Sequence, residues 1–377
     1  MLTVGFEEEF LLVDVDGAPL PLADEVLSWL HAHLGADDSA RFKPELKPFQ
    51  VEAVTLVHTN IAALRTDLST ARGRLAKAGH DCKLAVLPVG SAPTHYGADR
   101  GIGGVGRYAL IADRYREMTR TYTACGAHVH VGVDDLDQAV AVVNHLRPWL
   151  PTLIAVGANS PFHDGRDSGY SSWRVAEQAR FPGWGLPPYA RSADDYDNRV
   201  ATLVECGVFI DQHMSFWLAR PSEKYPTVEV RAADTAATVE DAVLQAVLTR
   251  GLVQTALRKL AEGIEGPRID DQVGAAAVWS AARYGLTGPA IDPIAQVRVP
   301  AMHMLDSLIA WIADEIEEAD DTAVTRQLLT ALHRHGTGAT RQRIAARSSI
   351  GELVDAFRLT GDRTSLSADG HESSAWG

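Results

Sequence analysis

Four segments of this 377-residue sequence place polar side chains at alternate positions, with apolar residues on the opposite side. In chain order, the polar pairs are Glu7/Glu9, Gln50/Glu52, His128/His130 and Glu229/Arg231. Because side chains alternate between the two faces of a β-strand, each segment is predicted to be a strand with one apolar and one polar face. Glu8 falls on the apolar face of the first segment, and the sequence gives no account of it.

The polar faces would gather carboxylates and imidazoles if the four strands line one concave sheet. The cluster would contain Glu7, Glu9, Glu52, His128 and Glu229. Like charges at close range raise one another's pKa, so such a cluster needs cations to stay ionised. Oxygen donors with few nitrogens and no thiolate suit Mg²⁺ or Mn²⁺ better than Zn²⁺. Because four carboxylates are too many for one Mg²⁺, we expect two or three ions that bridge a polyphosphate.

Arg231 lies two residues from Glu229 on the same predicted face, where it is expected to stabilise charge on a transferring phosphoryl group. The alternative interpretation is a set of solvated strand faces, which antiparallel sheets often have. Such faces usually carry threonine, serine, lysine and mixed charges, whereas carboxylate, imidazole and guanidinium groups dominate here.

The elements that must position these residues follow from the hydrophobic periodicity. Strand patterns dominate the first two-thirds of the chain and helical patterns the last third, without regular strand–helix alternation. This order favours an α+β fold with an antiparallel sheet over a doubly wound or barrel fold. A helix is predicted from Ile61 to about Ala78, with Thr59 or Asn60 as its N-cap.

Two segments are predicted as long loops. Gly97 to Gly106 is rich in glycine, and Asn159 to Asn198 has little periodicity. Loops of that length inside a compact protein are usually functional, so both are candidates to close over a site. Residues 1–367 are predicted to form a single catalytic domain, and 368–377 a disordered tail.

Composition limits the classes of partner. The net charge is −14, so we expect neither a nucleic acid nor an anionic membrane as partner. The first ten residues lack the basic and apolar stretches of an export signal, and no run of about 18 apolar residues occurs. Three cysteines without a CxxC motif favour reduced thiols and a cytoplasmic location over a zinc or redox site.

Taken together, an ordered set of motifs resembles the glutamate–cysteine ligase type 2 family, the YbdK-like carboxylate–amine ligases. The principal motifs are Gly5-Phe6-Glu7-Glu8-Glu9, Gly126-Ala127-His128-Val129-His130-Val131-Gly132, Ala158-Asn159-Ser160-Pro161 and Thr227-Val228-Glu229-Val230-Arg231. Further matches are Asp164-Gly165-Arg166-Asp167-Ser168-Gly169-Tyr170, Arg220-Pro221 and Ala281-Ala282-Arg283-Tyr284-Gly285. The resemblance implies a catalytic domain like that of glutamine synthetase, with a curved antiparallel sheet and helices packed on its convex side.

The same resemblance implies metal ligands. In the family, the two glutamates of the GxExE strand, here Glu7 and Glu9, belong to two different metal sites. His128 and Glu229 resemble the other ligands at the site of Glu7, and Glu52 and Glu45 the partners of Glu9. Glu45 lies an odd number of residues before Glu52 and cannot share its strand face, so its assignment depends on the resemblance alone.

Roles in catalysis and substrate binding also follow from the resemblance. Arg231 matches an arginine near the γ-phosphate of ATP, and we assign His130 to nucleotide binding and Glu52 to catalysis alongside Arg231. Arg174 and Arg220 are candidates to bind the α-carboxylate of an amino-acid substrate through a bidentate fork.

The activity implied is ATP-dependent amide formation through an acyl phosphate, with the γ-carboxylate of glutamate as the simplest acid and Mg²⁺ or Mn²⁺ as the metal. Cysteine is one candidate amine, but the residues do not identify the acceptor. The aromatic residues of the second long loop, Tyr170, Trp173, Trp184 and Tyr189, either select the amine or pack within the loop, and the sequence leaves both interpretations open. A homodimer is also expected to be feasible, because the last third is helical.

Two other functions stay open at this point. His128-Val129-His130 also suggests a binuclear metal-dependent amidohydrolase, although that class takes its HxH pair from the first strand of a barrel. The third candidate is a non-catalytic relative that binds a nucleotide or glutamate as a sensor.

Overall fold

The computed structural model of this chain describes residues 1–94, 101 and 106–360. The predicted tail at 368–377 and most of the predicted loop from Gly97 to Gly106 lie outside the described residues.

A seven-stranded antiparallel sheet crosses the molecule in the order β10-β11-β5-β1-β3-β2, with β4 also paired to β1. Its strands are β1 (Val4–Val13), β2 (Phe42–Pro44), β3 (Gln50–Val54), β4 (Ala85–Leu87), β5 (Gly126–Gly132), β10 (Ala219–Pro221) and β11 (Thr227–Asp234). The four strands predicted to carry polar pairs are β1, β3, β5 and β11, which are consecutive neighbours in this order. The predicted α+β fold with an antiparallel sheet is confirmed.

Helices make up most of the remainder. They are α1 (Ala23–His33), α2 (Ala36–Ser39), α3 (Ile61–Asp81), α4 (Arg107–Tyr115), α5 (Glu117–Arg120), α6 (Leu136–Leu146), α7 (Leu150–Gly157), α8 (Trp173–Gln178), α9 (Ala193–Glu205), α10 (Val239–Ala261), α11 (Asp271–Tyr284), α12 (Ala301–Trp311), α13 (Ala313–Glu318), α14 (Thr322–His335), α15 (Gly338–Ala345) and α16 (Ile350–Phe357). Short elements complete the fold: β6 (Phe162–His163), β7 (Arg166–Asp167), β8 (Trp184–Gly185), β9 (Phe216–Trp217), β12 (Pro289–Asp292), β13 (Val297–Pro300), and the 3₁₀ turns η1 (Gln212–Met214) and η2 (Gly285–Thr287).

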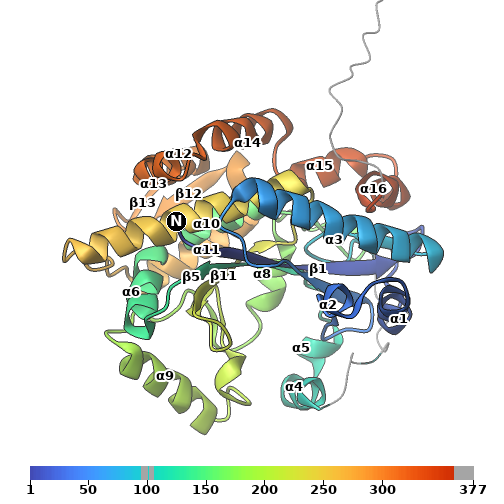
Figure 1. The fold of residues 1–377 in the computed structure, drawn as a ribbon, viewed down its shortest axis with the longest axis horizontal. Coiled ribbons are helices and arrows are strands. Elements are labelled where there is room, and N and C mark those ends of the chain that lie inside the picture. Colours follow the sequence, from blue (N-terminus) through green and yellow to red (C-terminus); the bar gives the residue numbers. More distant parts are fainter. Residues whose placement is uncertain (95–100, 102–105, 361–377) are drawn as a thin grey trace, which may run out of the picture.

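Helices cover the apolar face of the sheet. Phe6, Val129 and Val230 from β1, β5 and β11 pack in one core with residues of α3, α6, α7 and α10. Figure 1 shows α3 and α10 on one side of the sheet and α4, α5 and α9 on the other. The helix predicted from Ile61 is confirmed, and Asn60 caps it by accepting hydrogen bonds from the N–H groups of Ala62 and Ala63.

A buried ion pair accounts for Glu8. The Arg72 side chain on α3 donates to both carboxylate oxygens of Glu8, at 3.0 Å from Nε and 2.5 Å from Nη2, and also to the carbonyl of Ala236. Both side chains are buried, and each charge is compensated by the other. Glu8 therefore faces the core because α3 supplies its counter-charge.

Two expectations about the elements need correction. The segment from Asn159 to Asn198, predicted as one long loop, contains β6, β7, β8, α8 and the start of α9. The last third, predicted to be almost all helical, also contains the β12–β13 hairpin between α11 and α12. In both places the elements are short, so their sequence patterns extend over too few residues to be recognised.

Among the described residues, no individual helix has both the length and the apolar character needed to cross a membrane. The helices α6 and α7 meet these criteria only as a pair, and they are bent by 68° at the break between them.

Candidate active site

Strand register brings the predicted polar pairs into contact across the sheet. Glu7 lies opposite His128, Glu9 opposite Glu52, and Glu229 opposite both His130 and Arg220. All of these side chains, together with Glu45 and Arg231, line a cavity of about 310 Å³ on the face away from α3 and α10. The expectation that the four polar faces line one surface is therefore met.

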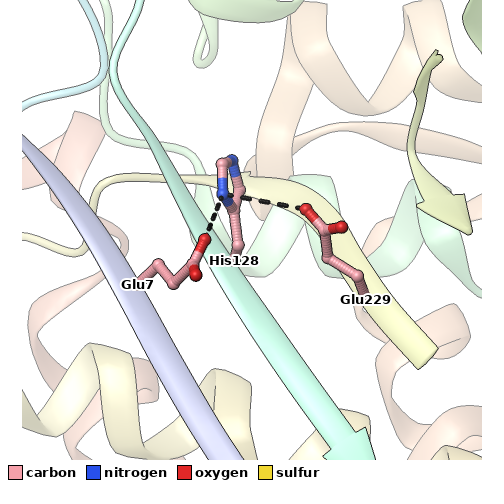
Figure 2. A group of neighbouring side chains, drawn as sticks. All are labelled: Glu7, His128 and Glu229. Carbon is pink, nitrogen blue, oxygen red and sulfur yellow. Dashed lines mark hydrogen bonds and ion pairs between the residues drawn. The ribbon is translucent and has the colours of Figure 1, made fainter. Parts of the chain in front are cut away.

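Glu7, His128 and Glu229 form the tightest group, and Figure 2 shows their side chains directed toward one another from three neighbouring strands. His128 Nδ1 lies 3.4 Å from Glu7 Oε2 and 4.0 Å from Glu229 Oε1. One ligand atom from each residue lies within 4.8 Å of the other two, so the three can hold a metal ion. These are the three residues predicted to share the metal site of Glu7.

The protonation states in this group suit a cation. Burial raises the pKa of Glu7, but its interactions with the His128 and His130 imidazoles outweigh that effect and hold the pKa below its ordinary value. Burial raises the pKa of Glu229 as well, but the Arg220 and Arg231 guanidiniums hold it well below its usual range. Burial and the charge of Arg231 lower the pKa of His128 to about 4. Two carboxylates are thus ionised beside a neutral imidazole, the form that binds metals.

Two buried imidazole nitrogens support the same conclusion. Nε2 of His128 and Nε2 of His130 are buried without a hydrogen-bond partner. Nε2 of His130 lies 3.6 Å from a Glu7 oxygen, and its Nδ1 lies 2.9 Å from the hydroxyl of Thr227. Buried polar atoms are normally satisfied, so two such nitrogens beside carboxylates fit a site for a divalent cation.

A second carboxylate group lies on the β3 side of the cavity. Burial raises the pKa of Glu9, of Glu52 and, well above its ordinary value, of Glu45, and the charges of neighbouring glutamates, Glu7 included, add to the effect. Glu9 accepts a hydrogen bond of 2.6 Å from the Gly126 N–H, and Lys43 pairs with Glu52 at 3.1 Å. Without a cation these carboxyls hold protons more tightly, and hard divalent ions are the groups that would displace those protons.

Two arginines reach the cavity beside Glu229. Arg231 is ion-paired with Glu229 and lies 3.4 Å from His128 Nδ1. Arg220 pairs with the other oxygen of Glu229 at 2.8 Å and also donates to the Ser215 carbonyl. Their guanidiniums are positioned to contact anionic groups in the cavity, phosphate or carboxylate.

Arg174, predicted to bind substrate, lies elsewhere. It is 1% exposed, donates to the main-chain carbonyls of Arg231 and Ala232, and is not among the residues that line the cavity. The positive charge of Arg174 still affects the site, because it lowers the pKa of Glu9 and so opposes the effect of burial. We therefore do not propose substrate binding for Arg174.

Several cavity residues carry no recognisable signal in the sequence. They are Arg107, Tyr108, Tyr122, Gln178, His213, Lys224 and Tyr225. Most come from helices or loops that cross the open face of the sheet, where no strand alternation marks which side chain points inward. The Tyr225 ring approaches His130 edge-on at 6.0 Å between centroids.

Comparison with known proteins identifies the family of this chain. A model of the glutamate–cysteine ligase family 2 matches residues 3–356. A Saccharopolyspora erythraea protein, provisionally named glutamate–cysteine ligase 2-2, is 48% identical over 92% of this chain and 88% of its own. A Nocardia farcinica protein, provisionally named glutamate–cysteine ligase 2-1, is 42% identical over 90% of this chain and 88% of its own.

Solved structures share the fold at low identity. The glutamate–cysteine ligase of Francisella tularensis in complex with AMP has a TM-score of 0.69 and 13% identity, covering 94% of this chain and 87% of that one. A bifunctional glutathione synthetase from Pasteurella multocida has a TM-score of 0.68 and 14% identity, covering 94% of this chain and 51% of that one. With a family match that spans nearly its whole length, this chain belongs to the glutamate–cysteine ligase family 2.

Proposed function

We propose that this chain is an ATP-dependent ligase that joins the γ-carboxylate of glutamate to an amine. The observation that carries the proposal is the cavity in which four glutamates, two histidines and two arginines converge from neighbouring strands, with a fifth glutamate, Glu45, just after β2. The family assignment and the names of the relatives support glutamate as the acid. The AMP bound by the Francisella tularensis ligase supports an adenine nucleotide as the energy source.

The chemistry proceeds in two steps. First, a γ-carboxylate oxygen attacks the γ-phosphorus of ATP, the bond from that phosphorus to the β,γ-bridging oxygen breaks, and ADP leaves. Next, an unprotonated amine attacks the acyl carbon, the bond from that carbon to the phosphate oxygen breaks, and the nitrogen loses a proton as the amide forms. Inorganic phosphate leaves with an oxygen that came from the carboxylate.

The glutamates and His128 are the proposed ligands of the metal ions. Glu7, His128 and Glu229 would hold one Mg²⁺ or Mn²⁺ ion, and Glu9, Glu45 and Glu52 would hold one or two more. When bound, these ions neutralise phosphate charge and align the attacking oxygen with the phosphorus.

The arginines contribute direct contacts. Arg231, which lines the cavity, would donate to the transferring phosphoryl group, where charge develops in the transition state. Arg220, which also lines the cavity and contacts Ser215, would bind a substrate carboxylate through its planar fork. His130, near Glu7 and Tyr225, would contact the nucleotide.

The two alternatives are less well supported. The amidohydrolase hypothesis depended on the His128 and His130 pair, and that pair lies in the middle of an open antiparallel sheet rather than on the first strand of a barrel. The sensor hypothesis does not require six potential metal ligands to converge, and all six line the cavity.

Release of ADP tests the proposal. The purified chain is incubated with ATP and Mg²⁺, with glutamate alone and then with glutamate and each of a panel of amines that includes cysteine. The proposal predicts ADP release that requires glutamate, increases with at least one amine, and is lost in Glu7→Gln. ADP release that does not depend on glutamate, or the absence of ADP release with every combination of substrates, would contradict the proposal.

A further inference from the structure

A second, larger cavity of about 890 Å³ lies next to the catalytic one. Its walls come from α8, α9, α11 and the β8–β9 pair, and four aromatic residues line it: Tyr170, Trp184, Trp217 and Trp279. Alanine, valine, leucine and proline side chains supply most of the remainder. A concave, mostly apolar cavity of this size is typical of a binding site for a small organic molecule.

One residue belongs to both cavities. Trp184 lines the catalytic cavity and the second cavity, and it is the single residue that the two linings share among the described residues. Its indole N–H donates to Gln178 Oε1 at 3.3 Å, and the Gln178 amide donates in turn to the Tyr122 hydroxyl at 3.1 Å. Gln178 and Tyr122 both line the catalytic cavity, so the indole forms part of the wall between the two spaces.

The backbone on either side of Trp184 has conformations that favour glycine. Trp184 and Phe216 are partners in the parallel β8–β9 pair, and Phe216 lines the catalytic cavity whereas its neighbour Trp217 lines the second one. Trp184 lies between Gly183 and Gly185, whose φ angles of 75° and 113° favour glycine. The chain thus uses two conformations that suit glycine to present one large aromatic side chain between the cavities.

Charge indicates what the second cavity takes. Its charged residues, Arg199 and Asp271, have side chains that are 44% and 88% exposed, and each is ion-paired, with Asp195 and Arg147 respectively. The groups suited to phosphates and carboxylates, Arg220 and Arg231, line the other cavity. The second cavity is therefore suited to an uncharged apolar body rather than to an anionic one.

We infer that the second cavity binds the apolar or aromatic body of the amine acceptor, whose nitrogen reaches the catalytic cavity past Trp184. This inference rests on the proposed function and names the substrate class: a primary amine with a large apolar substituent. Cysteine and other small polar amines leave the cavity unfilled, so they would react with lower kcat/KM. The other candidate occupant is the adenine ring of the nucleotide.

A variant that fills the cavity tests this inference. Ala275, an exposed residue of α11, lines the second cavity, and Gln272 is an exposed residue of the same helix that does not. Ala275→Phe is compared with Gln272→Phe as the matched control. Because an occupied pocket excludes a bulky substituent, Ala275→Phe should raise KM for 2-phenylethylamine by about tenfold or more. KM for ATP, glutamate and methylamine should stay unchanged, and Gln272→Phe should behave as wild type.

Calorimetric titration of 2-phenylethylamine into wild type and both variants gives a readout that does not require turnover. The expected result is binding that Ala275→Phe weakens and Gln272→Phe does not. No binding, or equal binding by Ala275→Phe, overturns the inference. A rise in KM for ATP in Ala275→Phe also overturns it, in favour of adenine. Glutamate-dependent turnover with small amines but no preference for apolar ones overturns this inference and leaves the proposed function standing. Absent turnover with intact amine binding contradicts the proposed function, and the cavity is then an amine-binding site but not the site of an acceptor.

Discussion

The carboxylate of Glu7 lies between two imidazoles on the polar face of β1, at 3.4 Å from His128 and 3.6 Å from His130. This arrangement leads us to expect that Glu7→Gln loses a divalent cation. Since changes even in the outer shell of a metal site reduce affinity about 10- to 100-fold, loss of a direct ligand should weaken Mn²⁺ binding by at least about 100-fold. Calorimetric titration of Mn²⁺ measures this, with Glu25→Gln on the exposed surface of α1 as control. Equal Mn²⁺ affinity in Glu7→Gln and wild type would rule out the assigned ligand.

Arg231 presents a planar fork where Lys would present a single ammonium. In Arg231→Lys the charge is retained but the paired donors are lost, and these donors are assigned to the phosphoryl group in the transition state. We expect kcat to fall by about 100-fold or more, with a much smaller change in KM for ATP. Steady-state kinetics separate the two parameters. If only KM for ATP rises, Arg231 binds the ground state and the assigned role is wrong.

Glu177, a residue of α8 that is not a proposed metal ligand, should make the stability of the fold depend on pH. Burial raises the pKa of its carboxyl to about 7, although the Thr123 N–H, at 2.9 Å, stabilises the charged form. The folded state thus holds this proton more tightly than the unfolded chain. Its contribution to stability is complete below the unfolded pKa of about 4.5 and is lost as pH rises to about 7.

Glu177→Gln should therefore remove a decline in stability between about pH 4.5 and pH 7, worth up to about 3 kcal/mol. Urea unfolding of wild type and variant at several pH values gives the difference. Parallel stability curves for the two proteins would show that Glu177 does not titrate in this range.

At the scale of elements, the Glu8–Arg72 pair ties β1 to α3. Removing one partner leaves a buried charge uncompensated, so Glu8→Gln should destabilise the fold by about 3–5 kcal/mol. The double variant Glu8→Gln/Arg72→Met should recover part of that loss, because no unpaired charge is left. Denaturant unfolding of wild type, the single variants Glu8→Gln and Arg72→Met, and the double variant tests the coupling. A double variant that loses the sum of the two single effects would show that the residues act independently.

The strands were predictable because each alternates over at least five residues, and the polar pairs on β1, β3, β5 and β11 do face one cavity. Their pairing partners were not predictable from periodicity, since the paired strands β1 and β5 lie more than 100 residues apart in the chain. Glu8 was inexplicable for the same reason, because its partner Arg72 is on α3, 64 residues away.

The segment after Asn159 shows why a local sequence pattern does not predict structure that tertiary contacts determine. The buried carboxylate of Asp234 accepts hydrogen bonds from the Asn159 N–H and from the hydroxyls of Ser160 and Ser172, at 2.7–2.8 Å. This network fixes the segment against the end of β11, and no periodicity of the sequence records it. Likewise the β12–β13 hairpin buries neither face fully, so it has no apolar alternation.

At the scale of the whole molecule, the sheet separates two environments. Its apolar face is covered by long helices, and its polar face lines the cavity of the candidate active site, beside the larger apolar cavity. The groups that we propose to act in phosphoryl transfer therefore lie on the sheet, and the groups that we propose to select the amine lie on the shorter elements around it. Sequence periodicity could reveal the first set and not the second, because short elements carry little pattern.

The central claim is that a carboxylate oxygen of the acid substrate attacks ATP. It is tested most directly with glutamate labelled with ¹⁸O in its γ-carboxylate, in the presence of ATP, Mg²⁺ and an amine that supports turnover. We predict that each molecule of amide formed is accompanied by one inorganic phosphate that carries one ¹⁸O atom, because the acyl carbon gives up that oxygen with the phosphate. Amide formed with phosphate that carries no label would contradict the acyl-phosphate route.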